Sequence, residues 1–300
     1  MSRRSVSASM NDGPDAERSA LIGTLRRHGI TPHKRLGQVF LFRRSIAEQI
    51  VSFARIDGSD LVVEIGAGLG ILTAPLADSG ARVIGLEYDS RLASYLKSEL
   101  HRGNLEVERA DALNFPYGRL SRRLGKKMII MGNLPYYLTS PLIFKLLGLR
   151  SYISRMVLMI QREAADRISA QAGTQGYGII SILSQVFFEV THRLTVLKDC
   201  FYPLPAVDSE VVLFTHRSRP LAALADERAF ITLVKLSFAH PRKTLLNAFK
   251  GCDYLSRGKE SIVETMNAAG IDPMRRAHTV SIDEYARLSN MLAAAQCPVV

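Results

Sequence analysis

Residues 61–70, "LVVEIGAGLG", run from an apolar stretch directly into three closely spaced glycines. A continuous apolar run of this length is typical of a strand buried in a parallel sheet. Glycines at its end allow the backbone to turn sharply into a helix and to approach a ligand closely. The stretch therefore predicts an α/β fold with a ligand site where its first strand ends.

Neighbouring segments continue the alternation of strand and helix. Residues 71–80 and 90–103 predict helices, each ending at a glycine, and residues 190–197 and 209–217 predict two late strands around a Pro-rich loop. Four more apolar segments predict strands that are largely buried in a parallel sheet: "ARVIGLE" (81–87), "LEVERA" (105–110), "KMIIMGN" (127–133) and "RMVLMI" (155–160).

From about residue 220 the strand pattern stops and the remaining segments have helical periodicity. We therefore expect an α/β domain over residues 31–219 and a small helical domain over residues 220–300. Residues 1–30 are polar, with acidic and basic side chains mixed, and predict a flexible tail.

The composition limits the classes of protein that need to be considered. The chain has 300 residues, of which 47% are hydrophobic, enough for a substantial buried core. No apolar run approaches the roughly 20 residues of a membrane span, and the first 30 residues lack the apolar core of a signal peptide. The cysteines and histidines show no metal-ligand spacing. We expect a cytoplasmic protein without a metal site, and the sequence indicates no obligate protein partner.

The net charge of +11 is unevenly distributed. Residues 118–170 contain ten Lys and Arg but only two Asp and Glu, whereas residues 61–117 carry an acidic excess. A local basic surface attracts polyanions such as RNA, with an affinity that falls steeply with salt. Charge alone is equally compatible with a surface that only keeps the protein soluble.

Three acidic residues follow three successive predicted strands. Glu64 directly precedes the turn made by Gly66, Gly68 and Gly70, and a carboxylate there would face a pyrophosphate unfavourably but would suit a cation or an amine. S-adenosylmethionine carries both and has no phosphate. Two further acids follow the next strands and could accept hydrogen bonds from ribose hydroxyls and from adenine: Glu87 and Asp111. The pattern favours an S-adenosylmethionine site over a purely structural turn.

The segment "GNLPYYLTSP" (132–141) leaves the fourth predicted strand beside that site. The exocyclic amine of adenine is a poor nucleophile until acceptors at its hydrogens free its lone pair. The Asn133 side chain and the Leu134 carbonyl could be those acceptors, with Pro135 stiffening the turn. Tyr136 offers a face on which a flipped base could stack. The alternative is an ordinary strand exit with a core tyrosine.

Taken together, several ordered motifs resemble the ribosomal RNA adenine dimethyltransferases, most nearly the KsgA type that acts on small-subunit rRNA. The resemblance runs from about residue 31 to residue 290. The motifs are "KRLGQVFL" (34–41), "EIGAGLGILT" (64–73), "GNLPYYLTSPLI" (132–143), "MIQREAADRI" (159–168), "GYGIISILSQ" (176–185), "FYPLPAVDS" (201–209) and "FAHPRKTLLNAFKG" (238–251).

The resemblance implies a Rossmann-like class I methyltransferase sheet and two methyl transfers from S-adenosylmethionine to each of two adjacent adenosines near the 3′ end of 16S rRNA, coupled to small-subunit biogenesis. Its partners would be the small ribosomal subunit and its rRNA. The residues implied for the cofactor are Val39, Leu41, Gly66, Gly68, Glu87, Tyr88, Asp111 and Asn133. Those implied for catalysis are Asn133, Leu134, Pro135, Tyr136 and Phe201, although core packing would equally explain Phe201.

The chain departs from the family pattern at Val39, where an amide is usual, at Arg43, near a position that is commonly acidic, and at Ala206, where lysine is common. Three rival functions remain open: a related large-subunit enzyme that confers macrolide resistance, an assembly factor with weakened catalysis, and a methyltransferase of DNA adenine. We expect an active enzyme, with weaker cofactor binding if the missing amide normally contacts the cofactor.

Overall fold

The computed structural model describes residues 13–250 and 259–296. Its strands are β1 (Phe40–Leu41), β2 (Leu61–Ile65), β3 (Arg82–Glu87), β4 (Leu105–Arg109), β5 (Met128–Asn133), β6 (Ile153–Gln161), β7 (Phe188–Val196), β8 (Phe201–Tyr202) and β9 (Ser209–His216). Its helices are α1 (Pro14–Arg27), α2 (Arg44–Phe53), α3 (Thr73–Asp78), α4 (Ser90–Glu99), α5 (Tyr117–Leu124), α6 (Thr139–Gly148), α7 (Arg162–Ser169), α8 (Ile179–Phe187), α9 (Glu227–Phe238), α10 (Leu245–Phe249), α11 (Lys259–Ala268) and α12 (Ile282–Gln296).

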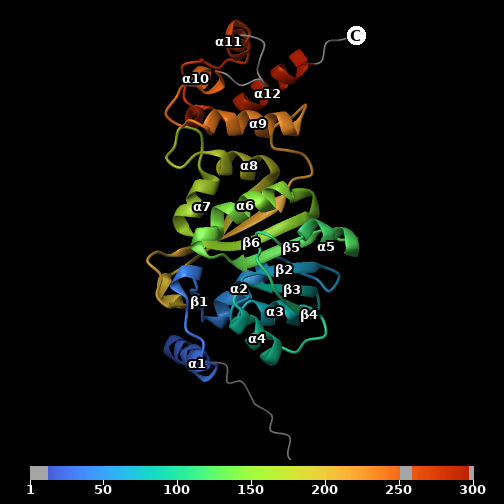
Figure 1. The fold of residues 1–300 in the computed structure, drawn as a ribbon, viewed down its shortest axis with the longest axis vertical. Helices are drawn as coiled ribbons and strands as arrows, with labels where there is room; N and C mark the ends of the chain where they lie inside the picture. Colours follow the sequence, from blue (N-terminus) through green and yellow to red (C-terminus); the bar gives the residue numbers. More distant parts are fainter. Residues whose placement is uncertain (1–12, 251–258, 297–300) are drawn as a thin grey trace, which may run out of the picture. The chain divides into compact units, whose positions relative to one another are not determined.

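Seven of these strands form one sheet in the order β4-β3-β2-β5-β6-β9-β7 (Figure 1). The first strands run parallel, with Val63 paired to Ile84 on β3 and to Ile130 on β5. The chain moves outward from β2 through β3 to β4 and then returns to the other side of β2 as β5. A ligand crevice is expected where the strand order reverses in this way, which here is between the carboxyl ends of β2 and β5.

The predicted strands are confirmed, but the burial of one strand and the end of one helix differ from the prediction. β2, β3 and β5 are almost wholly buried, but β4 is the edge strand and alternates between partly buried and exposed residues, so its expected burial was wrong. Helix α4 was predicted to end at Gly103, but it ends at Glu99, and the backbone of Leu100 is no longer helical. The Leu100 side chain lies against Gly70, where an added Cβ would come within 2.6 Å of it.

The expected polar tail differs from the structure over residues 14–27, which form α1. Pro14 begins the helix, as its fixed φ allows. Leu25 is buried and packs in one cluster with Ile30, Phe40 and Leu92. Spaced apolar residues in a polar segment thus bury one face of this helix, a signal that the overall composition obscured. Residues 1–12 of the expected tail lie outside the described residues.

Contacts divide the chain into two compact units. The first comprises residues 1–139, 155–162 and 193–212, and the second comprises residues 140–154, 163–192 and 213–300. The predicted C-terminal helices are present, but α6, α7 and α8 belong to the same unit as these helices, so this division does not follow the expected boundary at residue 219. Arg150 explains part of this grouping, because it pairs with Glu227 and stacks over the ring of Phe187.

None of the helices in the described ranges is long and apolar enough to cross a membrane.

Candidate cofactor and catalytic site

A cavity of about 430 Å³ opens at the carboxyl ends of β2, β3 and β5, within the first unit. The structure brings every residue that was proposed from the sequence to the wall of this one cavity. These residues are Val39, Leu41, Gly66, Gly68, Glu87, Tyr88, Asp111, Asn133, Leu134, Pro135, Tyr136 and Phe201. The cavity therefore lies where the reversal of strand order predicts a ligand site.

The glycine turn forms one wall of the cavity. Gly66 and Gly68 adopt positive φ angles of 75° and 59°, which side chains with a Cβ rarely tolerate. A Cβ added to Gly66 would lie 3.4 Å from the carbonyl oxygen of Asn133. The ends of β2 and β5 can therefore approach each other closely, leaving backbone rather than side chains to face a ligand.

Glu87 is held in place by the backbone around it. One of its carboxylate oxygens accepts a hydrogen bond from the Gly68 amide at 2.9 Å, and the other accepts from the Asp89 amide at 2.8 Å. Burial raises the pKa of Glu87, and these two hydrogen bonds partly oppose that rise. Because each oxygen retains a second lone pair, the oriented carboxylate can still accept from a pair of hydroxyls.

Next to Glu87, Asp89 caps α4 by accepting from the Arg91 amide, and it also forms an ion pair with the Arg91 side chain. The hydrogen bond from the Arg91 side chain is the main reason why the pKa of Asp89 lies well below its usual range. Gln38 donates to the other carboxylate oxygen of Asp89 at 3.0 Å, which ties the segment before β1 to this edge of the sheet. Sequence analysis missed Gln38, since its partner lies 51 residues away.

Asp111 sits in a local turn after β4. Its side chain accepts from the Leu113 amide at 2.8 Å and from the Asn114 side chain at 2.7 Å. The neighbouring Tyr88 is 60% exposed, so its ring is available to cover a planar group at the mouth of the cavity. A second exposed tyrosine, Tyr137, also lines the cavity and was not among the predicted site residues, because the sequence does not show which of two adjacent tyrosines faces a cavity.

Glu64 lines the same cavity, but it is only 1% exposed. Its Oε2 atom has no hydrogen-bond partner in the described part of the chain. Burial raises the pKa of Glu64 to about 8, an effect that the nearby Thr73 hydroxyl partly offsets and the charge of Glu87 reinforces. An isolated buried carboxyl of this kind favours a cationic ligand that would stabilise its charged form.

This burial predicts a particular pH dependence of stability. Between about pH 4.5 and pH 8 the folded protein retains a proton on Glu64 that the unfolded chain has released, so the free energy of unfolding should fall as the pH rises. The loss should be on the order of 3 kcal/mol, and Glu64→Gln should largely remove it. Denaturant unfolding of both proteins at pH 5 and pH 8 checks this prediction, and equal declines would contradict it.

Asn133 ends β5 and has a fixed orientation. Its side-chain Nδ2 donates to the main-chain oxygen of Val39 at 3.1 Å. Since a carbonyl oxygen can only accept, the atom of the Asn133 amide that faces Val39 must be the nitrogen. Asn133 Oδ1 remains as an acceptor for another group. Val39 thus contributes its backbone, so the valine at a position where the family has an amide does not disturb this contact.

The residues after Asn133 are anchored as well. The Leu134 amide donates to the Met159 carbonyl on β6 at 3.0 Å, while the Leu134 side chain is buried. The ring of Tyr136 is partly buried, and this burial raises the pKa of its hydroxyl. The turn that carries the proposed acceptors is therefore anchored by two hydrogen bonds, from the Asn133 side chain to Val39 and from the Leu134 amide to Met159.

Phe201 reaches the cavity through a short strand pair. β8 pairs antiparallel with β1, with Phe201 opposite Leu41 and Tyr202 opposite Phe40. Phe201 is only 2% exposed, so its ring is both part of the core and part of the cavity wall. Core packing and contact with a base are thus compatible for this residue.

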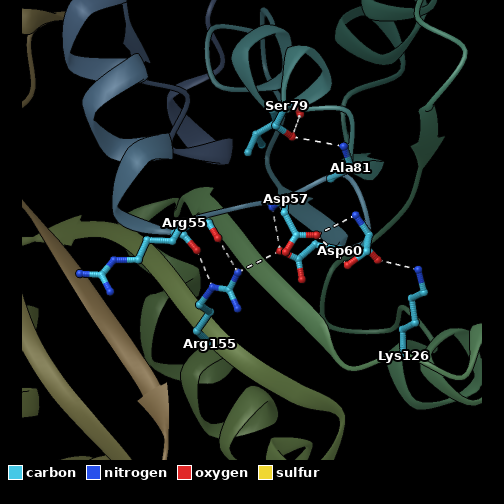
Figure 2. A network of polar contacts seen from close by, with 10 residues as sticks. Arg55, Asp57, Asp60, Ser79, Ala81, Lys126 and Arg155 are labelled. Carbon is cyan, nitrogen blue, oxygen red and sulfur yellow. Dashed lines mark hydrogen bonds and ion pairs between the residues drawn. The ribbon is translucent and has the colours of Figure 1, made fainter.

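Two arginines of the basic stretch form ion pairs and hydrogen bonds within the protein. Arg155 forms an ion pair with Asp60 at 3.0 Å and donates to the main-chain oxygens of Ala54 and Arg55 (Figure 2). Arg150 is paired with Glu227. Within the basic stretch over residues 118–170, these two arginines therefore make internal contacts, which the charge count did not distinguish from exposed cations.

The sequence belongs to a known family. Residues 29–294 match the family model described as ribosomal RNA adenine dimethylase. The chain is 41% identical over 275 residues to "Ribosomal RNA small subunit methyltransferase A" of Pelotomaculum thermopropionicum, an alignment that covers 89% of this chain and 93% of the relative.

The chain belongs to the ribosomal RNA adenine dimethylase family. It is accordingly an adenine dimethyltransferase enzyme, and the proposed residues line the cavity of a dimethylase.

Solved structures agree with this dimethylase fold. A dimethyladenosine transferase from Plasmodium falciparum aligns with a TM-score of 0.68 and 28% identity, covering 82% of this chain and 94% of that one. The 23S rRNA methyltransferase ErmE aligns with a TM-score of 0.63 and 24% identity over 85% of this chain and 99% of its own. At that identity the second likeness shows the fold alone.

Among the described residues, no group of three or more His, Cys, Asp and Glu side chains is placed to hold a metal ion.

Proposed function

We propose that this dimethylase transfers methyl groups from S-adenosylmethionine to the exocyclic amines of two adjacent adenosines near the 3′ end of small-subunit rRNA. The observation that carries the proposal is the fixed Asn133 amide. Its hydrogen bond to Val39 uses Nδ2 and leaves Oδ1 as an acceptor on a residue that lines the same cavity as the glycine turn.

The residues present fit S-adenosylmethionine. The glycine turn admits a close ligand, and Glu87 and Asp111 offer carboxylates to hydroxyls and to an amine. Glu64 supplies an unpartnered buried acid that suits a positively charged group. When bound, S-adenosylmethionine supplies an activated methyl group. Its affinity should rise with pH toward about 8, because a cation in the cavity favours the charged form of Glu64.

At the target, Asn133 Oδ1 and the Leu134 carbonyl would accept the two hydrogens of the adenine amine. This contact disfavours a flat amine and makes its lone pair available for attack. Tyr136 and Phe201 would hold the flipped base between their rings. Each transfer forms one N–C bond, breaks one C–S bond and releases one proton from the amine to water. No side chain has to act as a strong base.

Small-subunit rRNA is favoured over the large subunit by the relatives. Proteins named "Ribosomal RNA small subunit methyltransferase A" match at 36% to 41% identity over most of the chain, whereas ErmE shares 24% of its residues with this chain. Such a substrate would place the protein in the cytoplasm, where small subunits are assembled.

The direct test uses purified protein, labelled S-adenosylmethionine and small subunits that lack the modification. Large subunits and duplex DNA serve as parallel substrates. We expect label in dimethyladenine of the small subunit alone. Label in the large subunit would replace this proposal with the resistance-type activity, and specific binding without transfer would instead indicate an assembly factor.

A further inference from the structure

A short segment of the first unit concentrates positive charge. Five cations fall between residues 119 and 127 without an acidic residue among them: Arg119, Arg122, Arg123, Lys126 and Lys127. All five are exposed, while Tyr117, Leu120 and Ser121 bury the other face of α5. The helix is therefore fixed to the unit by its buried face and presents its cations to solvent.

Three of these cations recur every fourth residue. Arg119 and Arg123 lie about one turn apart on α5, and Lys127 follows the left-handed Gly125 that ends the helix. No ion pair or hydrogen bond of these three side chains is found in the described part of the chain. Arg119 and Arg123 are like charges four residues apart in the helix, which oppose each other by roughly 0.2–0.5 kcal/mol. By contrast, Lys126 donates to the main-chain oxygen of Ser59 (Figure 2). A bound polyanion would remove this repulsion.

The last of these cations lies at the opposite edge of the sheet from the cavity. Lys127 directly precedes β5, which begins at Met128 and ends at Asn133. Five steps of a parallel strand span roughly 17 Å, so Lys127 lies at the amino edge of the sheet and Asn133 at the carboxyl edge. Phosphates that contact Lys127 must therefore belong to a part of the RNA other than the target nucleotide.

We propose that Arg119, Arg123 and Lys127 form a second RNA-binding surface, which holds phosphates remote from the adenosines being methylated. The inference rests on the proposed function, because it takes structured rRNA as the substrate. A surface at this distance from the cavity would contact a part of a folded RNA that the cavity does not reach. The surface fixes the orientation of the RNA, and the cavity selects the base.

The test compares two triple variants with the same change in net charge. One carries Arg119→Gln, Arg123→Gln and Lys127→Gln. The control carries Arg26→Gln, Lys97→Gln and Arg228→Gln, which are exposed cations on other helices. Binding to unmodified small subunits is measured across a range of salt concentrations, with S-adenosylmethionine binding as the check that each protein is folded.

We expect the first variant to bind small subunits about 10- to 100-fold more weakly at about 100 mM salt, with a salt slope shallower by about 2–3. Its binding of S-adenosylmethionine should be unchanged. Equal weakening in the control would show a general effect of net charge and overturn the inference, as would an unchanged salt slope in the first variant. Methylation of small subunits by the unaltered protein is measured in parallel with labelled S-adenosylmethionine. Failure of that reaction would overturn the proposed function, whereas the binding comparison tests the second surface alone.

Discussion

Methyl transfer by Asn133→Ala should fall by a factor of roughly 100 or more, with the fold retained. The substitution removes the acceptor proposed for the adenine amine, and losing one positioned polar group at a reacting centre commonly costs this much. It also removes the hydrogen bond to Val39, but Asn133 is only partly buried and the Leu134 amide remains bonded to Met159. Single-turnover methylation of small subunits, with thermal unfolding alongside, gives both quantities.

Asn133→Asp is the companion variant, because it retains an acceptor oxygen but replaces the Nδ2 donor with a second oxygen and adds a negative charge. An oxygen in place of Nδ2 repels the Val39 carbonyl, so the side chain should lose its fixed orientation. We expect its activity to lie at or near the level of the alanine variant. Near-normal rates in both variants would show that Asn133 does not act on the adenine amine.

Gly132→Ala should damage both stability and activity, although it adds a single methyl group. A Cβ at Gly132 would lie 2.3 Å from the carbonyl oxygen of its register partner Ile65, a contact that only a shift of one strand can relieve. Overpacking of this kind typically costs about 1–3 kcal/mol, and a collision between two backbones in a central strand pair should fall at or above the upper end. The next residue, Asn133, would move with the strand.

Gly148→Ala is the comparison for this variant, since a Cβ there meets nothing within 4 Å and Gly148 ends α6 at an ordinary φ. We expect that protein to be as stable as the original or slightly more stable. The measurements are the denaturant midpoints and methylation rates of the original protein, Gly132→Ala and Gly148→Ala. Only Gly132→Ala should lose both stability and activity. A Gly132→Ala protein of normal stability would mean that β2 and β5 do not pack as closely as the structure indicates.

Local patterns in the sequence predicted the central sheet and the cavity wall. Apolar runs identified β2, β3 and β5, and polar residues directly after parallel strands necessarily meet at one edge, as Glu87 and Asn133 do. The family resemblance added Val39 and Phe201, whose segments show no local signal for a shared cavity. Their proximity depends on the pairing of β1 with β8.

Long-range polar partners could not be predicted in this way. Nothing beside Arg155 in the sequence indicates that it pairs with Asp60, 95 residues earlier, and Gln38 likewise bonds to a distant Asp89. A count of charges treats every arginine as available, whereas folding commits some of them to internal pairs. Helix α1 was missed for a related reason, since its single buried leucine, Leu25, acquires partners only in the folded chain.

The division of the first unit into three stretches has a consequence for how the protein is made. During synthesis the ribosome releases residues 1–139 long before residues 193–212, which close that unit through β8. A nascent chain that has not yet emerged past Tyr202 lacks one wall of its own cavity. The wall of the cavity that Phe201 forms therefore cannot be in place until more than two thirds of the chain has been translated.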